Sequence, residues 1–171
     1  MKPISFQTDI LPLKNELFRM ALRITQNREE AEDVVQETMI KVWKRREQWS
    51  QLESIEAFCL TICRNLALDK LRRMDNQVQS LGDDINPMDH SHGSNPEQVT
   101  ILHERTQMVR QLINDLPERL RTCMQLRDIE GKSYRDIATI LDITEQQVKV
   151  NIFRARQAVK DRFLKIEQLK E

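Results

Sequence analysis

Hydrophobic positions in the N-terminal part of the chain recur with the spacing of amphipathic helices, from residue 10 to residue 73. Asn27 is a suitable N-cap for a helix over residues 29–45, because Glu29 and Glu30 would lie in its first turn. The positions expected on the buried stripe of this helix are Ala31, Val35, Thr38 and Val42. The helix predicted over residues 54–73 has apolar residues on too many sides for a surface helix. We therefore expect it to be buried at first and then polar and basic.

The helical periodicity fails after Met74, where the sequence becomes polar, acidic and rich in turn-forming residues. We interpret residues 76–96 as a flexible linker without a core of its own. Asn95 and Pro96 would then begin a new helix. The predicted fold is all-α, with two small helical domains at 1–75 and 97–171 that the linker joins.

Residues 133–156 combine two short helical patterns with a turn between them and predict a helix-turn-helix. Ser133 and Thr144 are the expected N-caps, and Gln147 completes a capping box with Thr144. Asp142 would occupy the bend in a left-handed conformation. Val148, Ile152, Ala155, Val159 and Phe163 share the inner face of the second helix. Its outer face carries Gln146, Val150, Phe153, Arg154 and Gln157, flanked by Lys149, Arg156 and Lys160.

An outer face of this kind suits the major groove of DNA, with side chains reaching base edges and cations contacting phosphates. An ordinary two-helix corner with a solvated basic face explains the same pattern and stays open on the motif alone. The net charge of the chain is zero, but the charge is segregated. Residues 41–75 hold eight basic and five acidic residues. Residues 105–171 hold fourteen basic and ten acidic residues. Residues 76–104 have five acidic residues and no Lys or Arg. Local positive charge of this kind favours nucleic-acid binding.

Composition narrows the class of protein further. Apolar residues make up 39% of the chain and charged residues 32%, and no secretory signal or membrane-length apolar run is visible, so we expect a cytoplasmic protein. The three cysteines are an odd number, which favours a reducing compartment. Cys59 and Cys63 would stack on one helix face, but no second pair of ligands follows, so we expect no metal and no cofactor. No nucleophile is paired with a base, which argues against an enzyme and a small-molecule substrate.

Three segments in this order and spacing resemble the extracytoplasmic-function group of bacterial sigma-70 factors. "AEDVVQETMIKVW" is similar to the helix of that family that binds RNA polymerase, and "AFCLTICRNLALDKLRR" to its helix for the minus-ten promoter element. "LPERLRTCMQLRDIEGKSYRDIATILDITEQQVKVNIFRARQAVKDRF" is similar to its domain for the minus-thirty-five element. The resemblance covers nearly the whole chain apart from the linker. It implies a sigma-2-like helical bundle followed by a sigma-4-like helix-turn-helix bundle.

The resemblance also assigns residues to partners. It implies contacts of Asp33, Gln36 and Glu37 with core RNA polymerase, through the D-x-x-Q-E pattern. For the minus-ten element it implies Asn65, near the pocket for a flipped-out base, with Arg64, Lys70, Arg72 and Arg73 facing phosphates. Lys44, Arg45, Arg46 and the loop through Ser54 fall where the family has its specificity loop. We expect Trp49 in the core and leave Trp43 open between a packing role and strand melting. For the minus-thirty-five element it implies Gln146, Lys149, Val150, Asn151, Arg154 and Arg156.

The family resemblance implies a factor for transcription initiation, with core RNA polymerase, double-stranded promoter DNA and the melted minus-ten strand as partners. The promoter would open by capture of a flipped base. The family resemblance also implies an anti-sigma factor as a partner, and in this family that factor is often anchored in the membrane. The acidic linker suggests the hypothesis that it occupies a basic cleft of the polymerase. The alternative is a stand-alone helix-turn-helix transcription regulator, which would leave "AEDVVQETM" unexplained.

Overall fold

A computed structural model describes residues 2–81 and 101–170, and it describes no side chain of residues 78–81. Within these ranges the chain is helical and contains no strand, which confirms the all-α expectation. The helices are α1 (Lys14–Thr25), α2 (Arg28–Lys44), α3 (Ile55–Leu81), α4 (Ile101–Asn114), α5 (Glu118–Met124), α6 (Tyr134–Leu141) and α7 (Glu145–Leu169). Short 3-10 or π turns occur at η1 (Phe6–Ile10), η2 (Leu11–Leu13), η3 (Arg46–Gln51) and η5 (Gln125–Ile129).

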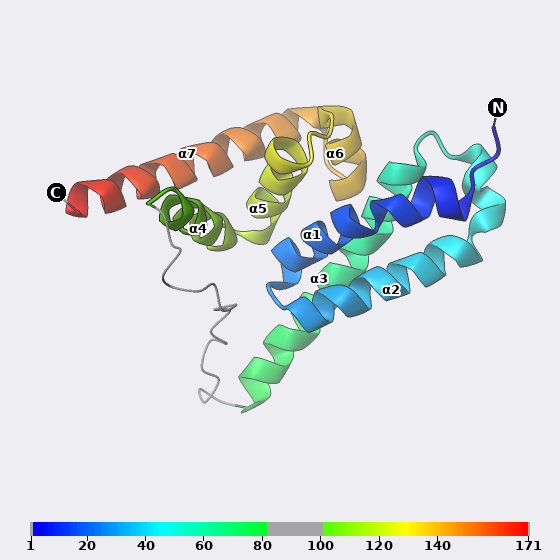
Figure 1. The fold of residues 1–171 in the computed structure, drawn as a ribbon, viewed down its shortest axis with the longest axis horizontal. Helices are drawn as coiled ribbons and strands as arrows, with labels where there is room; N and C mark the ends of the chain where they lie inside the picture. The colour runs from blue at the N-terminus through cyan, green and yellow to red at the C-terminus, as the bar shows by residue number, and fades with distance from the viewer. Residues whose placement is uncertain (1, 82–100, 171) are drawn as a thin grey trace.

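Helices α1, α2 and α3 pack side by side into the N-terminal bundle (Figure 1). Their apolar stripes meet in the centre, where Leu17, Ile24, Val34 and Leu60 are at most 1% exposed. Burial of each such side chain contributes about 2 kcal/mol relative to exposure. The predicted stripe of α2 is confirmed, because its four positions are all buried.

A tight connection turns the chain from α1 into α2. Gln26 adopts a left-handed conformation with φ 55° at the end of α1. The side-chain oxygen of Asn27 then accepts a hydrogen bond of 3.1 Å from the backbone N–H of Glu30. The predicted N-cap is therefore confirmed, and it satisfies one of the amide groups that a helix leaves without a partner in its first turn.

Helix α3 continues to Leu81, beyond the end of the domain that the sequence analysis expected at residue 75. The expectation that helical structure ends there was wrong. No Gly or Pro interrupts the sequence between residues 55 and 81, and the first is Gly82. The rest of the predicted linker, its cleft hypothesis, and the predicted helix start at Asn95 and Pro96 lie outside the described residues.

Helices α4 to α7 form the C-terminal bundle, in which α5 and α4 pack against the long helix α7. A separate apolar cluster joins them through Leu112, Ile113, Leu116, Ala155 and Val159. The inner face predicted for α7 is confirmed, with Phe163 partly buried at its edge.

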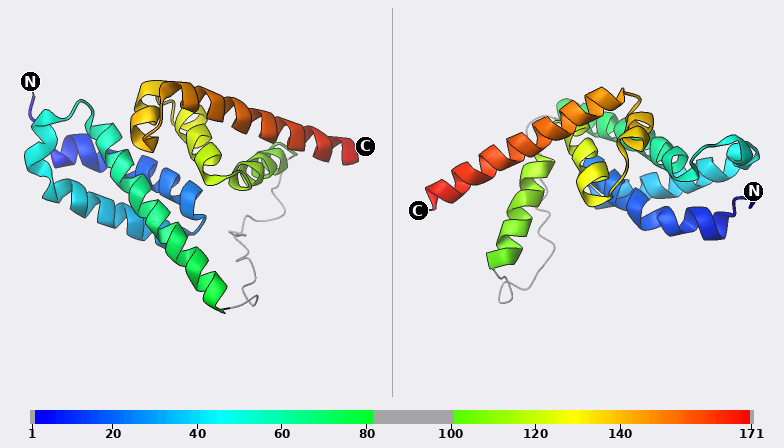
Figure 2. Two further views of the ribbon diagram at one scale, coloured as in Figure 1. Left: turned by 180° about the vertical axis from the view of Figure 1, so that it is seen from behind. Right: turned by 90° about the horizontal axis from the view of Figure 1, so that it is seen from above.

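The two bundles also pack directly against each other, which the sequence analysis did not anticipate. Helix α6 lies against α3, and α5 lies against α1, as the views of Figures 1 and 2 show. Ile137, Ile140 and Leu141 of α6 belong to the same hydrophobic cluster as Leu60 and Cys63 of α3. The core is therefore continuous across the two bundles.

Candidate nucleic-acid interface

Helices α6 and α7 form the predicted helix-turn-helix, and local hydrogen bonds fix its geometry. The hydroxyl of Ser133 accepts from the N–H of Asp136 at 3.1 Å. Thr144 and Gln147 exchange two hydrogen bonds of 3.1 and 3.0 Å in a complete capping box. Between the helices, Asp142 is left-handed with φ 55°. These features confirm the predicted caps and bend, and they give α7 a fixed direction relative to α6.

The outward face of α7 presents most of the residues predicted to contact DNA. Gln146, Lys149, Val150 and Arg154 are exposed, and Phe153 is 68% exposed. An exposed aromatic ring next to a guanidinium on a helix supported by a buried inner face is suited to contact bases and sugars.

Asn151 and Arg156 are less free than the sequence suggests. Asn151 is half-buried, and its Nδ2 lies 3.9 Å from the sulfur of Cys123 as a donor. Arg156 forms a two-point ion pair with Asp128, in which its Nε donates at 3.0 Å. The hydrogen bond with Asp128 raises the pKa of Arg156. These two residues are therefore already engaged by the C-terminal bundle itself.

Tyr134 at the start of α6 lies beside the candidate interface, and the sequence analysis did not single it out. The guanidinium of Arg127 lies 4.3 Å from the centre of its ring, and the ammonium of Lys149 lies 5.6 Å from it. Two cationic groups therefore lie over the Tyr134 ring, beside the outward face of α7. The only signal in the sequence was an aromatic residue directly after the Ser133 cap.

The residues predicted to bind polymerase form an exposed ridge on α2. Asp33, Gln36 and Glu37 are all exposed, on the side of the helix away from its buried stripe. Their spacing of three and four residues places them on one helix face. We call these three residues the α2 ridge.

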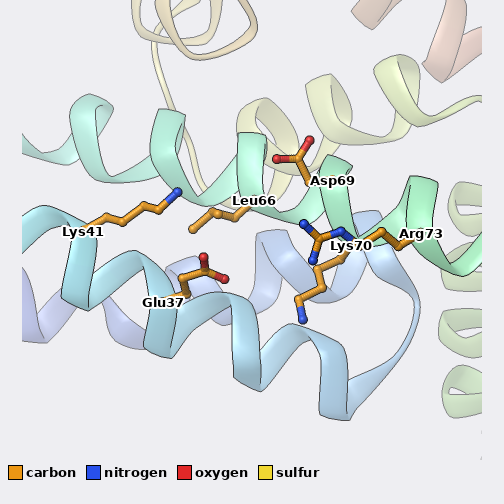
Figure 3. A pocket seen from close by; sticks show the side chains of 6 residues that line it. All are labelled: Glu37, Lys41, Leu66, Asp69, Lys70 and Arg73. Carbon is orange, nitrogen blue, oxygen red and sulfur yellow. The ribbon is translucent and has the colours of Figure 1, made fainter.

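A shallow hollow of about 100 Å³ lies between α2 and α3 beside this ridge (Figure 3). It is lined by Glu37, Lys41, Leu66, Asp69, Lys70 and Arg73. The ammonium of Lys70 also lies 3.5 Å from the carboxylate of Glu30. The hollow brings one member of the α2 ridge next to two basic residues predicted to contact the minus-ten element.

The predicted minus-ten residues fall into two groups. Asn65, Arg72 and Arg73 are exposed, and Lys70 is half-buried. Arg64, in contrast, is only 8% exposed and points toward the C-terminal bundle. Its Nη2 lies 3.5 Å from the carboxylate of Glu118. Glu118 of α5 therefore lies against Arg64 in this arrangement, and contact of Arg64 with phosphates stays a prediction.

The two tryptophans after the α2 ridge have different environments. Trp49 is buried and donates to the carbonyl of Val42 at 3.1 Å, which confirms its place in the core. Trp43 is 47% exposed, and the guanidinium of Arg46 lies 4.7 Å from its ring centre. Its ring also makes edge-on contacts with Phe6, at 5.7 Å between centroids, and with Trp49, at 6.1 Å.

The cysteines show no sign of chemical activation. All three are buried, and burial raises the pKa of Cys59 and of Cys63 to about 12. Burial also raises the pKa of Cys123. Across 2–81 and 101–170, no group of three His, Cys, Asp or Glu side chains is placed to hold a metal ion. No helix in those ranges is both long and apolar enough to cross a bilayer.

Sequence comparisons identify both bundles. Residues 10–77 match the family Sigma-70 region 2, and residues 106–159 match Sigma-70, region 4. The RNA polymerase sigma-H factor of Pseudomonas aeruginosa is 30% identical over 162 residues, which cover 91% of this chain and 84% of that protein. The ECF RNA polymerase sigma-E factor of Escherichia coli is 33% identical over 134 residues, or 74% of this chain and 70% of that protein.

Two solved structures share the fold. The sigma factor RpoE of Bartonella quintana, in complex with the anti-sigma factor NepR, superposes with a TM-score of 0.72 at 24% identity. That match covers 94% of this chain and 97% of RpoE. CnrH, in complex with the cytosolic domain of CnrY, has a TM-score of 0.66 at 18% identity, covering 91% and 85% of the two chains.

Proposed function

Because this chain belongs to the extracytoplasmic-function group of the sigma-70 family of RNA polymerase sigma factors, we propose that its two bundles divide the work of promoter recognition. As a member of this family, the chain is a transcription initiation factor. In the proposal the N-terminal bundle binds core RNA polymerase and the minus-ten element. The C-terminal bundle binds the minus-thirty-five element.

The α2 ridge is the proposed contact with core polymerase, and it is the observation that carries the proposal. Asp33, Gln36 and Glu37 form a polar face that the fold leaves exposed, although the opposite face of α2 is buried. None of the three makes a hydrogen bond or ion pair within residues 2–81 and 101–170 that would explain the ridge as structural support. A carboxylate-bearing face of this kind suits a basic partner helix.

The α2 ridge can be tested by pull-down with core polymerase. We expect the triple variant D33A/Q36A/E37A to lose core binding and promoter-directed transcription in vitro. Glu32, which is also exposed on α2 and pairs with Arg28 at 3.3 Å, supplies the matched control E32A. Binding of the triple variant equal to that of E32A would contradict the proposal.

For the minus-ten element, we propose that Asn65 reads a flipped-out base of the melted strand. Its side chain is exposed on α3, and an amide can donate to and accept from a base edge. Lys70, Arg72 and Arg73 follow in the basic stretch of α3 and would contact phosphates. A fluorescent base analogue placed in the minus-ten element reports the flip, and we expect N65A to reduce its signal without loss of core binding.

For the minus-thirty-five element, we propose that α7 enters the major groove with its outward face. Gln146, Val150 and Arg154 would reach base edges, while Lys149 would neutralise a phosphate. Asn151 and Arg156 would contribute less to DNA binding, because both already interact with residues of the C-terminal bundle. The C-terminal bundle alone would also suit a stand-alone regulator, but that function leaves the α2 ridge without a partner.

We also propose an anti-sigma factor as a regulatory partner. The support is that RpoE, which shares the fold, was solved in complex with the anti-sigma factor NepR, and that CnrH was solved in complex with the cytosolic domain of CnrY. Exposed apolar side chains on both bundles, among them Ile40 at 54% and Leu102 at 75%, provide surface for it. Co-purification of the tagged full chain from its native host checks this proposal.

A further inference from the structure

The C-terminal bundle caps the end of helix α1 through Arg121. This side chain, 8% exposed, donates from Nε to the carbonyl of Arg23 and from Nη2 to the carbonyl of Ile24, each at 2.9 Å. Nη1 donates to Leu116 at 2.9 Å within its own bundle. The two α1 carbonyls lie in the last turn of α1, where a helix lacks internal partners and favours a cation. The contact is therefore specific to the packed arrangement.

A second cation crosses the same boundary at Lys132. Its ammonium lies 2.6 Å from the carboxylate of Glu16 on α1 and also contacts Glu56 on α3. Gly131, directly before it, adopts φ 71°, and the backbone N–H of Lys132 donates to the carbonyl of Leu126 at 2.9 Å. Arg19 and Glu130 add an ion pair beside it. We call Arg19, Arg121, Glu130 and Lys132 the latch.

The packing of the two bundles places an acidic residue, Glu118, against Arg64, a predicted DNA-binding residue. Glu118 of α5 lies 3.5 Å from Arg64 of α3. The side chain of Arg64 is 9% exposed, and its Nε has no hydrogen-bond partner among the described residues. A buried cation with one long ion pair and an unpartnered donor is poorly satisfied, so a better set of acceptors can replace Glu118. Phosphate oxygens are such acceptors.

We propose that Glu118 is an intramolecular competitor of DNA for Arg64, and that the latch holds it in place in the free chain. The proposal rests on the proposed function at the minus-ten element and on the prediction, implied by the family resemblance, that Arg64 contacts phosphates there. The closed state leaves the α2 ridge and the outward face of α7 exposed, so it does not hide the whole molecule. It withholds Arg64 and fixes the two DNA-binding helices at one separation. Opening of the latch releases both restraints.

The experiment measures binding of the full chain to a short, fluorescein-labelled single-stranded DNA of mixed sequence by anisotropy. E118Q keeps the size of the side chain but removes the charge that faces Arg64. The matched control is D115N, because Asp115 is exposed, lies just before α5 and bonds to Gln111 instead of Arg64. Both variants change the net charge of the C-terminal bundle by the same amount. Core polymerase pull-down is run on the same samples.

We expect E118Q to bind DNA about threefold to tenfold more tightly than the wild type and more than D115N does, as loss of one competing ion pair implies. The gain should disappear in R64Q/E118Q, whose folding is checked by circular dichroism. Equal affinities of E118Q and D115N, or a gain that persists without Arg64, overturn the proposal. Loss of core binding by the wild type would instead overturn the proposed function, so the two failures are distinguishable.

Opening itself is followed by small-angle X-ray scattering of the free chain. We expect a compact wild type and a larger radius of gyration for R19E/K132E, in which two latch contacts become repulsive. A wild type as expanded as this variant overturns the proposal, because no closed state would then exist to withhold Arg64.

Discussion

The guanidinium of Arg19 and the carboxylate of Glu130 meet side by side across the two bundles, with Nε to Oε1 at 2.6 Å and Nη2 to Oε2 at 2.8 Å. Glu130 is almost fully buried in this contact, whereas Arg19 remains about half exposed. The hydrogen bond to Glu130 is the main cause that raises the pKa of Arg19. Two-point geometry and partial burial distinguish this pair from an ordinary surface ion pair.

This geometry predicts the effect of removing Arg19. We expect R19Q to lower the free energy of unfolding by about 1 kcal/mol, a value reduced for the solvent exposure of the arginine. Urea denaturation of the full chain measures it. The control is R28Q, because Arg28 and Glu32 form an exposed pair within one helix that should contribute about 0.3 kcal/mol. Equal losses of unfolding free energy in R19Q and R28Q would show that the Arg19–Glu130 pair stabilises the chain no more than an exposed surface pair does.

The capping box of α7 predicts a difference between two small substitutions. T144A removes the side-chain oxygen that accepts from Gln147, and we expect a loss of about 1 kcal/mol in unfolding free energy. T144S keeps that oxygen and should lose much less. Thermal unfolding followed by circular dichroism distinguishes them, and similar stabilities for the two variants would argue against a role of the cap.

Contacts of α7 with phosphates predict a salt dependence. K149A should weaken binding to all DNA sequences alike and reduce the slope of log affinity against log salt by about 1. Lys165 is exposed near the far end of the same helix, so K165A is the control and should keep the wild-type slope. Titrations of double-stranded DNA at several salt concentrations measure both. A change of sequence preference in K149A would instead place Lys149 at a base.

The two tryptophans predict opposite results for one type of substitution. W49A should cost about 3–5 kcal/mol, because it leaves a cavity and removes the donor to Val42. W43A should change stability by less than about 1 kcal/mol, since Trp43 is already 47% exposed. Denaturant unfolding checks both values. A large loss of stability in W43A would assign Trp43 to the core after all.

The buried thiols predict a loss of stability at alkaline pH. The pKa of Cys59 and that of Cys63 are raised to about 12 by burial, above the value of an exposed thiol. Above an exposed thiol's pKa the unfolded chain releases protons that the folded chain retains, so the stability falls as the pH rises from about 9 toward 12. We expect C59A/C63A to lose less stability than the wild type between these pH values in denaturant titrations. Parallel losses would exclude the thiols as the cause.

Local structure was largely determined by the sequence alone. The caps at Asn27, Ser133 and Thr144, the left-handed Asp142 and the inner face of α7 all follow from interactions within a few residues. Such features depend on backbone hydrogen bonds and helical periodicity, which neighbouring residues decide. The same reasoning placed the α2 ridge and the outer face of α7 at the surface. It failed for the end of α3, where a polar composition was taken for a linker although no helix breaker precedes Gly82.

Only the tertiary structure decided which of those faces meet. Arg64 looked like a phosphate ligand in a basic segment, yet Glu118, far away in the chain, covers it. The sequence assigned no partner to Arg121 or Lys132, and the structure shows that their partners include Arg23, Ile24 and Glu16 in the other bundle. The physical reason is that ion pairs and apolar contacts depend on separation in space, and no periodicity along the chain encodes which of two compatible surfaces will pack together.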